Sequence, residues 1–406
     1  MHLQQHFTRT LVMGALAAMS LPALAQSHQP VTASAGGFDF LYDFVSDNGT
    51  VFSEGPVTRG PDGRWLASVV QTPADKSLPN DVMLVTEDRN VDIMGKKDYH
   101  YSVQSMARNG SSLQGNMVSA FDDRMTHAYR LDIISGKFQQ LDGGNNVTFA
   151  NAASPSGQQI VGRVGLGGSQ HAFIWSLGGT VKDIGTLGGA TSEATAVSSS
   201  GDWVAGVSDG YTTTGHAFLY NNAIGMKDLG TLNNHSVRPV AVSTSGSVVA
   251  GNTSNHRAFR YVDGRGMQDL GTLGGKEATV VAMSDNGNVI MGYSAPAVGK
   301  DHVFVYTQNG MNDLGTLPGA GDFHPAAMSA NGGVIVGDFE KDGHRHAFYY
   351  VANGQLVDLT DTLNAAYADQ GGVRDAYLTQ LSSSGDLISG NLVDGQGVQH
   401  VFALAR

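Results

Sequence analysis

The sequence predicts an all-β fold, namely a β-propeller of four-stranded blades. The first observation is a motif that returns about every 45 residues, a period typical of propeller blades. The second is a composition of 54 glycines and only 15% charged residues, which fits many short strands joined by tight turns. The third is that the two ends of the chain complete one repeat. The turn glycines of the motif are Gly63, Gly110, Gly157, Gly201, Gly246, Gly287, Gly332 and Gly385.

Each repeat divides into four strands, which are clearest at residues 196–232. A short first strand ends near Val197, and a Ser-x-x-Gly turn follows in which glycine supplies the positive φ of the hairpin. The second strand contains a small residue, Gly206, which suggests close approach to the neighbouring blade. The third strand carries His-Ala-Phe and the fourth carries Asp-Leu-Gly-Thr-Leu. The aromatic of the third strand recurs at Tyr129, Phe173, Phe218, Phe259, Phe304, Phe348 and Phe402.

The ring is expected to close through the N-terminal strand. The Phe402 repeat has no fourth strand, and residues 38–45 read as the missing one. Closure removes the exposed edges of an open array, whereas a stacked solenoid would need polar caps at both ends. Eight turn glycines favour eight blades; seven is the alternative if the weak first repeat, residues 57–95, pairs irregularly. Residues 360–369 interrupt the period and predict one short helix capped by Thr360 or Asp361.

The first residues predict export. Arg9 precedes an apolar stretch at 11–19, and Ala23-Leu-Ala25 forms an A-x-A exit, so residues 1–25 read as a signal peptide. We expect a flexible mature N-terminus at 26–37, a single propeller domain at 38–406, and a periplasmic or extracellular location. The apolar stretch is too short to span a bilayer, and no later segment approaches about 20 apolar residues, so no transmembrane segment is expected.

The composition also restricts stability and partners. The chain has no cysteine, so no disulfide stabilises it. Its net charge of −12 disfavours phosphate backbones, so nucleic acid is not expected as a partner.

The repeat resembles the HAF-repeat family. Gly-His-Ala-Phe at 215–218, Gln-His-Ala-Phe at 170–173 and Arg-His-Ala-Phe at 345–348 carry the resemblance, each followed by an Asp-containing strand. It covers roughly residues 105–402, with departures at Arg257-Ala-Phe259 and His302-Val-Phe304. The family comprises predicted extracellular bacterial proteins with no assigned general activity. The resemblance therefore implies an exported repeat fold and leaves the activity open.

The recurring histidines are the first candidate site. A ring of imidazoles could bind metal or sense pH. Metal ligands, however, must converge within about 2 Å of one ion, whereas residues repeated once per blade lie one blade apart. We therefore predict side-chain hydrogen bonds within each blade and no metal site. The histidines concerned are His127, His171, His216, His302, His346 and His400.

A second candidate is a match to the nucleophile pattern G-x-S-x-G at residues 206–210. That chemistry needs a sharp strand-to-helix turn. Ser208 instead ends a strand and leads into a polar loop, so the match is attributed to chance.

The lengths of the links define two faces of the predicted disc. Links from strand 1 to 2 and from 3 to 4 lie on one face, here called the turn face, and are mostly short and uniform. Links from strand 2 to 3 and between blades lie on the other, the variable face, where their length and chemistry differ. Variable loops on a rigid scaffold usually carry binding. The binding candidates on this face are Asp209, Tyr211, His235, Arg238, Asp322, His324, Asp338, Glu340, Asp342 and His344.

The sequence favours a non-catalytic, exported propeller that binds a protein or a carbohydrate through this face. The acid and imidazole groups could bind a divalent cation or a sugar hydroxyl, or simply form a solvated acidic rim; no cofactor is predicted. The alternative is a secreted hydrolase or lyase acting on a polymer, which predicts two carboxylates roughly 5–10 Å apart, one with a raised pKa. A third reading is a scaffold for a larger envelope complex. No catalytic residue can be assigned.

Overall fold

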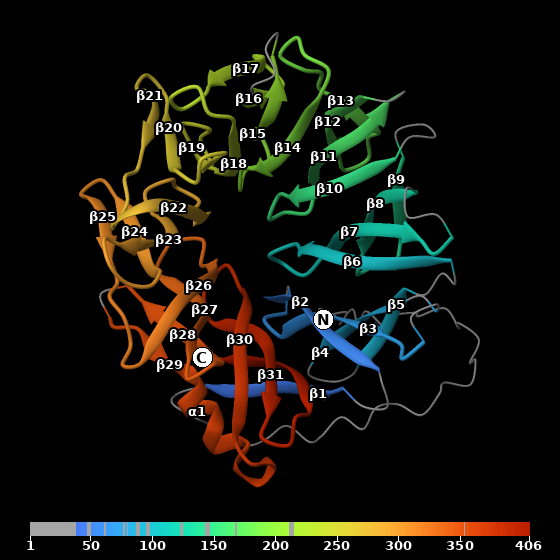
Figure 1. Ribbon diagram of the computed structural model, residues 1–406. Coiled ribbons are helices and arrows are strands. Elements are labelled where there is room, and N and C mark those ends of the chain that lie inside the picture. Colours follow the sequence, from blue (N-terminus) through green and yellow to red (C-terminus); the bar gives the residue numbers. More distant parts are fainter. Residues whose placement is uncertain are drawn as a thin grey trace, which may run out of the picture.

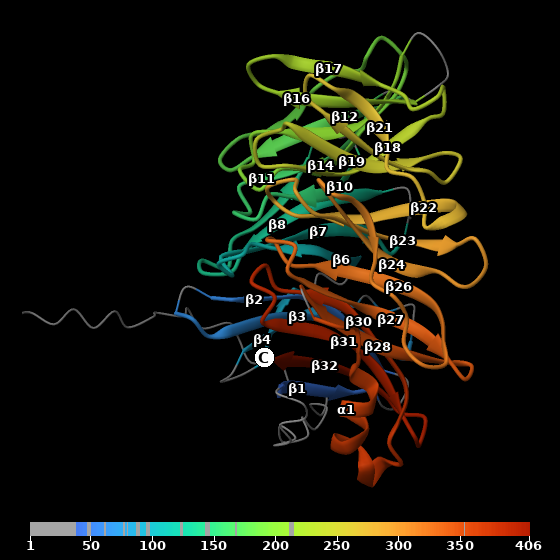
Figure 2. The ribbon, with the colours of Figure 1, turned by 90° about the vertical axis from the view of Figure 1, so that its left-hand side faces the viewer.

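The computed structural model is a ring of eight antiparallel, four-stranded sheets (Figure 1). The side view shows the blades stacked around this ring (Figure 2). The structure describes residues 38–46, 50–60, 62–75, 78, 80–86, 90–94, 98–121, 125–142, 147–166, 169–210, 215–352 and 354–406. The predicted signal peptide and residues 26–37 lie outside these ranges. The prediction of eight four-stranded blades is confirmed, and the seven-blade alternative is wrong because the weak first repeat also forms a complete sheet.

Blades 1 to 7 follow one another along the chain, each beginning with its innermost strand. Blades 1 and 2 contain β2 (Val51–Arg59), β3 (Trp65–Thr72), β4 (Asp81–Thr86), β5 (Asn90–Met94), β6 (Tyr99–Met106), β7 (Ser112–Ser119), β8 (Thr126–Asp132) and β9 (Phe138–Leu141). Blades 3 and 4 contain β10 (Thr148–Ala153), β11 (Gln159–Leu166), β12 (Ser169–Ser176), β13 (Val181–Asp183), β14 (Ser192–Val197), β15 (Val204–Asp209), β16 (Gly215–Asn221) and β17 (Gly225–Gly230).

The remaining blades keep the same order until the last. Blades 5 and 6 contain β18 (Val237–Val242), β19 (Val248–Thr253), β20 (Ala258–Val262), β21 (Gly266–Asp269), β22 (Gly274–Met283), β23 (Ile290–Pro296), β24 (His302–Thr307) and β25 (Gly310–Asp313). Blades 7 and 8 contain β26 (Ala320–Met328), β27 (Val334–Lys341), β28 (His344–Val351), β29 (Val357–Asp358), β30 (Val373–Leu381), β31 (Leu387–Asp394), β32 (Gln399–Ala405) and β1 (Asp39–Val45).

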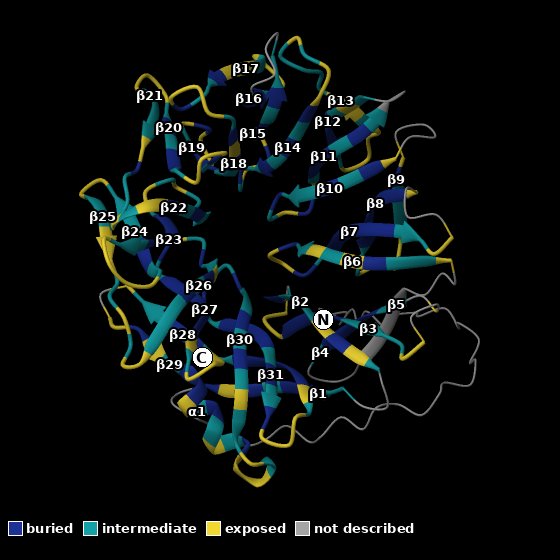
Figure 3. Cartoon of the chain, viewed as in Figure 1, coloured by how far each residue is buried: buried dark blue, intermediate teal, exposed yellow. Residues whose placement is uncertain are grey.

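The N-terminal strand closes the ring, as predicted. β1 pairs antiparallel with β32, with Asp43 opposite Phe402 and Phe44 opposite Val401. In Figure 1 the blue β1 lies beside the red strands of blade 8. Phe40 and Phe402 are buried in the same hydrophobic cluster, so the two ends of the chain also share a core. Figure 3 shows that buried residues run through the strands of every blade.

A buried clasp joins these two ends. His400 Nδ1 lies 2.9 Å from Asp43 Oδ1, His400 Nε2 lies 3.4 Å from Asp394 Oδ2, and the Tyr367 hydroxyl donates to Asp43 at 2.9 Å. The side chains of His400 and Asp43 are only 3% and 4% exposed. Burial works against the charged imidazole, but the hydrogen bonds and charges of the two carboxylates outweigh it, and the pKa of His400 is raised.

The raised pKa gives the clasp a pH dependence of known sign. Folding favours the protonated imidazole, so its stabilisation is fully present below pH 6.5 and is lost as pH rises through the folded-state pKa of His400. We expect His400→Asn to lower the melting temperature more at pH 6 than at pH 9. Thermal unfolding of both proteins at the two pH values measures this. His216→Asn, in an exposed pair, is the matched control, and an equal effect of His400→Asn at both values would contradict the assignment.

The Ser-x-x-Gly turns form as predicted, and their glycines face the preceding blade. In the turn at 198–201, the Gly201 N–H donates to the Ser198 carbonyl, the Trp203 N–H donates to the Ser198 hydroxyl, and Gly201 has φ +83°. A Cβ on the equivalent Gly246 would lie 2.2 Å from the Trp203 ring of the preceding blade. Glycine is therefore required there by both the positive φ and the packing between blades.

The glycine of the second strand has a different role from the one expected. A Cβ on Gly206 would lie 2.1 Å from the carbonyl oxygen of Glu193 in β14 and 2.6 Å from the Phe218 ring in β16. Both neighbours belong to the same blade, so the predicted close approach to the neighbouring blade is wrong. The first strand bulges towards this position and leaves no room for a side chain. In blade 1 the glycine is on the first strand instead of the second: Gly55 of β2 faces Ser68 of β3.

The predicted short helix is present, but its cap is another residue. Helix α1 spans Leu359–Ala366, and a 3₁₀ turn at Ala368–Gln370 follows it. Asp358 is the N-cap and accepts the Thr360 N–H at 3.0 Å. The Thr360 hydroxyl is buried and accepts the Ala347 N–H at 2.7 Å, which leaves it unable to cap the helix.

Candidate functional site

The repeated histidines pair with aspartates of the outer strands. His216 Nδ1 lies 3.0 Å from Asp228 Oδ2, and the same carboxylate accepts the Gly230 N–H at 2.7 Å. Where the repeat has arginine, the Arg257 guanidinium binds both oxygens of Asp269 at 3.0–3.1 Å. The predicted structural hydrogen bonds are thus present in blades 3 to 8. The other such pairs are His171–Asp183, His302–Asp313, His346–Asp358 and His400–Asp43. In blade 2, His127 Nδ1 lies 3.3 Å from Asp142 but makes no hydrogen bond to a described residue.

Two other expectations concern chemistry. Among the described residues, no three His, Asp or Glu side chains are placed to hold one metal ion. The divalent cation considered from the sequence therefore finds no ligand set in this part of the chain. The Ser208 hydroxyl is buried, accepts the Leu187 N–H at 2.9 Å and lies 3.2 Å from the Thr191 carbonyl, so backbone groups occupy it.

The candidates on blades 4 and 5 do not form one site. Asp209 ends β15 and accepts a hydrogen bond from the Thr191 hydroxyl, and His235 forms an isolated bridge with Leu232. Tyr211 lies outside the described residues. Arg238 is the second residue of β18 and is the one described candidate of this group that joins a cluster.

That cluster is centred on Glu193, which the sequence analysis did not single out. Glu193 accepts hydrogen bonds from Arg238 at 2.6 Å, Asn151 at 2.9 Å and Arg163 at 3.3 Å. Burial raises the pKa of the Glu193 carboxyl, but the bonds and charges of Arg238 and its neighbours outweigh burial, so the net pKa is lowered. The arginines come from blades 3 and 5 and the carboxylate comes from blade 4. The cluster therefore links three consecutive blades.

The candidates of blade 7 lie in longer strands than expected. β27 continues to Lys341 and β28 begins at His344, because their ladder extends to the Lys341–His344 pair. Asp338 and Glu340 are therefore strand residues, and only Asp342 and Gly343 form the turn. Of these candidates only Asp342 lies in a loop, so the expectation that all of them lie on variable loops is wrong.

The acids of blades 7 and 8 are mostly neutralised by cations. Asp338 is 5% exposed and accepts from Arg345 Nε at 2.8 Å, with His324 Nδ1 at 3.1 Å. The hydrogen bond to Asp338 raises the pKa of His324. In the next blade, Asp375 lies 3.2 Å from His344 and 2.8 Å from Arg374. Part of the acidic rim considered from the sequence is therefore ion-paired, whereas Glu340 and Asp342 are exposed and have no ion pair with another described residue.

One carboxyl group beside this array has a raised pKa. The backbone N–H of Asp301 donates to Asp322 Oδ1 at 2.8 Å, and Lys300 Nζ lies 3.0 Å from Asp322 Oδ2. Burial and the neighbouring Asp322 charge raise the pKa of Asp301, whereas the pKa of Asp322 is lowered despite its burial, because it accepts the Asp301 N–H and the Lys300 ammonium. Two carboxyls of unlike pKa thus lie side by side on the variable face.

The variable face also carries exposed apolar side chains, which the sequence analysis did not identify. Val298 and Phe121 are 92% and 83% exposed. Most of the group lies on blades 1 to 3, whereas Val298 lies on blade 6. The exposed apolar residues of this face are Val51, Leu78, Phe121, Met125, Val147 and Val298.

Comparisons with known proteins show the fold alone. No protein-family model and no curated protein sequence matches the chain. Among solved structures, an oligogalacturonate lyase in complex with manganese is 12% identical at a TM-score of 0.50, over 88% of this chain and 96% of that one. The C-terminal WD40 domain of Sif2 is 11% identical at a TM-score of 0.50, over 88% and 98%.

A further likeness involves a longer protein. A prolyl endopeptidase structure is 9% identical at a TM-score of 0.47, over 84% of this chain, which spans 46% of that protein's length. The oligogalacturonate lyase and Sif2 structures share the β-propeller architecture of the chain, at identities that carry no functional assignment. None of the helices in the described part of the chain is long and apolar enough to span a membrane.

Proposed function

We propose that this protein is an exported, non-catalytic propeller of the HAF-repeat type that binds a protein partner through its variable face. The observation that carries the proposal is the group of exposed apolar side chains on that face, mostly on blades 1 to 3 with Val298 on blade 6, beside the ion pairs of blades 6 to 8. Exposed aromatic and aliphatic side chains beside a polar rim are the usual composition of a protein interface. A glycan site would instead require a concave aromatic or polar pocket.

The proposal is tested by placing a photo-crosslinking amino acid at exposed apolar positions of the two faces. Phe121 and Val298 are the variable-face sites, and Ile134 and Ile224, which are 71% and 55% exposed in links from strand 3 to strand 4, are matched sites on the turn face. In the envelope fraction of the producing cells, we expect a protein adduct from the variable-face sites only. Equal adducts from both faces, or none from Phe121 and Val298, would contradict the proposal.

The enzyme alternative is kept because of the Asp301–Asp322 pair. A carboxyl with a raised pKa beside an ionised one is the arrangement that acid–base cleavage of a polymer needs. If this pair were catalytic, Asp301→Asn would lower any polysaccharide-degrading activity of the purified protein by at least about 100-fold. Under the binding proposal the wild-type protein has no such activity and Asp301→Asn leaves the crosslinked adduct unchanged.

A further inference from the structure

The turns on the turn face are joined into two arcs around the central channel. The second residue of each turn bonds to its neighbour in the next blade: Asp285 N–H donates to the Ala330 carbonyl at 2.8 Å, and Ala330 N–H to the Ser383 carbonyl at 2.9 Å. These bonds, with Thr244 and Ser199, join blades 4 to 8. Blades 1 to 3 form the other arc through Thr58, Arg108 and Pro155.

One ion pair spans the channel between the two arcs. Arg108 Nη2 lies 2.6 Å from Asp285 Oδ2, although the residues are 177 positions apart and belong to blades 2 and 6. In an eight-bladed ring these blades are opposite one another. The side chains remain 38% and 33% exposed, so the pair is reachable from solvent.

The two partners of the ion pair line different cavities. One cavity, of about 180 Å³, is lined by blades 1, 2 and 8 and includes Arg108; the other, also about 180 Å³, is lined by blades 3 to 6 and includes Asp285. Each is smaller than the roughly 300–1,000 Å³ of most ligand pockets, whereas the two joined would fall within that range.

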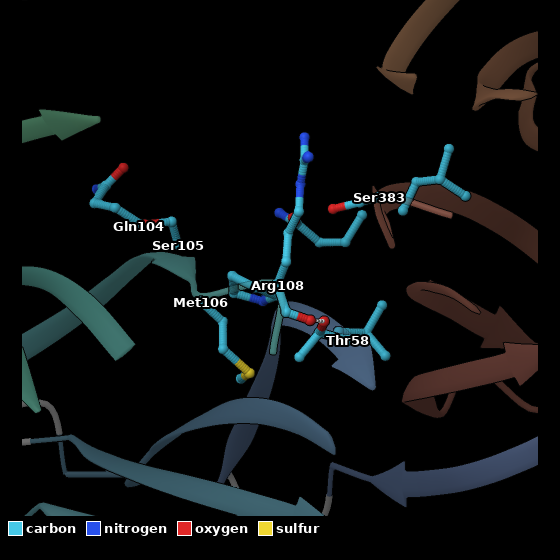
Figure 4. Close-up of a pocket in the computed structure, with 10 residues that line it drawn as sticks. Thr58, Gln104, Ser105, Met106, Arg108 and Ser383 are labelled. Carbon is cyan, nitrogen blue, oxygen red and sulfur yellow. Dashed lines mark hydrogen bonds between the residues drawn. The ribbon is translucent and has the colours of Figure 1, made fainter. Parts of the chain in front are cut away.

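The cavity that includes Arg108 is lined by polar side chains with unused hydrogen-bonding groups. Among the described residues, the side chains of Gln104, Gln380 and Ser383 have no hydrogen-bond partner, and only Nη2 of the Arg108 guanidinium has one. Figure 4 shows Arg108 extending into the cavity with the Ser383 hydroxyl directed towards it and Gln104 on the other side. Asp285 contacts the guanidinium through a single oxygen, so the two-point contact that arginine offers a carboxylate is not used.

We propose that this end of the channel binds a small hydroxylated carboxylate, such as a sugar acid, whose carboxylate takes the place of Asp285 on Arg108. The guanidinium supplies the charge and a two-point hydrogen bond. The amides of Gln104 and Gln380 and the Ser383 hydroxyl supply donors and acceptors for ligand hydroxyl groups. Asp285 acts as an internal competitor that holds the site closed when no ligand is bound. This site is on the opposite face from the one proposed for the protein partner.

The two partners of the ion pair can be changed without altering the arcs. The backbone groups of Arg108 and Asp285 make the bonds between turns, so R108Q and D285N leave those bonds in place. The experiment is calorimetric titration of the full-length protein with D-glucuronate at constant ionic strength, with D-glucose as the ligand control. We expect glucuronate and not glucose to bind, R108Q to weaken binding by at least about tenfold, and D285N to tighten it by about threefold or more.

A second ion pair on the same face serves as the control. Arg59 and Asp386 join blades 1 and 8 at 2.6 Å and line neither cavity, so R59Q should leave glucuronate binding unchanged. Thermal unfolding of every variant checks that the fold is kept. The proposal is overturned if neither the wild-type protein nor D285N binds glucuronate, if glucose binds equally well, or if R108Q and R59Q have the same effect on binding.

Discussion

Replacing Asp43 with alanine is expected to lower the stability of the propeller by about 3–5 kcal/mol, the cost of breaking a buried ion pair. The change leaves the His400 imidazole buried with only Asp394 at 3.4 Å, and it removes the acceptor of the Tyr367 hydroxyl. It also acts on the strand pair that closes the ring, so opening there exposes two sheet edges at once. Urea unfolding followed by tryptophan fluorescence measures the loss.

Asp228→Ala is the matched control, because it removes the same kind of pair from an interior blade. The side chains of His216 and Asp228 are 27% and 49% exposed, and an exposed pair contributes about 0–1 kcal/mol. The loss of the Gly230 N–H bond adds about 1 kcal/mol. If Asp43→Ala lowered the stability no more than Asp228→Ala does, the buried clasp would contribute no more stability than an exposed histidine–aspartate pair of another blade.

Replacing Gly292 with alanine is expected to cost about 3 kcal/mol, the upper end of the usual cost of overpacking. The added Cβ would lie 1.9 Å from the Thr279 carbonyl oxygen and 2.7 Å from the Phe304 ring. The first neighbour is backbone held in the β22–β23 ladder, so it cannot rotate away. The melting temperature and the urea midpoint should both fall.

The control for this change is Gly210→Ala. An added Cβ at Gly210 meets no atom within 4 Å, so its effect should stay within about 0.5 kcal/mol. A similar loss of stability for both variants would contradict the assignment of the cost to the clash at Gly292, because the lost freedom of glycine in the unfolded chain by itself stabilises the protein. A small effect of Gly292→Ala alone would show that the bulge of β22 can relax.

Most contacts of the candidate site could not be predicted from the repeat, although the spacing between residues indicates some of them. Aspartate follows the repeated histidine or arginine by 11 or 12 residues in five blades, as in His171 and Asp183. That constant spacing could have identified the pairs, since the two residues lie on adjacent strands. Asp43 could not be identified in this way because its partner, His400, is 357 positions away.

The charged candidates illustrate the other difficulty. The sequence predicts Asp338 and His324 on neighbouring loops, yet they lie opposite one another on paired strands, and Arg345 completes their cluster. Glu193 was missed because nothing in its own repeat distinguishes it; its arginine partners come from the blades on either side. A sequence pattern gives the type of side chain at each position and not the charges that surround it.

The repeat, the four strands of each blade and the glycine turns can be read from the amino-acid sequence, because turn chemistry and alternating hydrophobicity act within about 45 residues and recur in every repeat. Closure by the first strand could also be predicted, because the last repeat lacks one strand and residues 38–45 supply it. The contacts between charges of different blades, the gathering of the apolar side chains and the reach of Arg108 to Asp285 across the channel are visible in the folded protein alone. Such contacts depend on the curvature of the closed ring, which sets the distance between blades and is a property of all eight together.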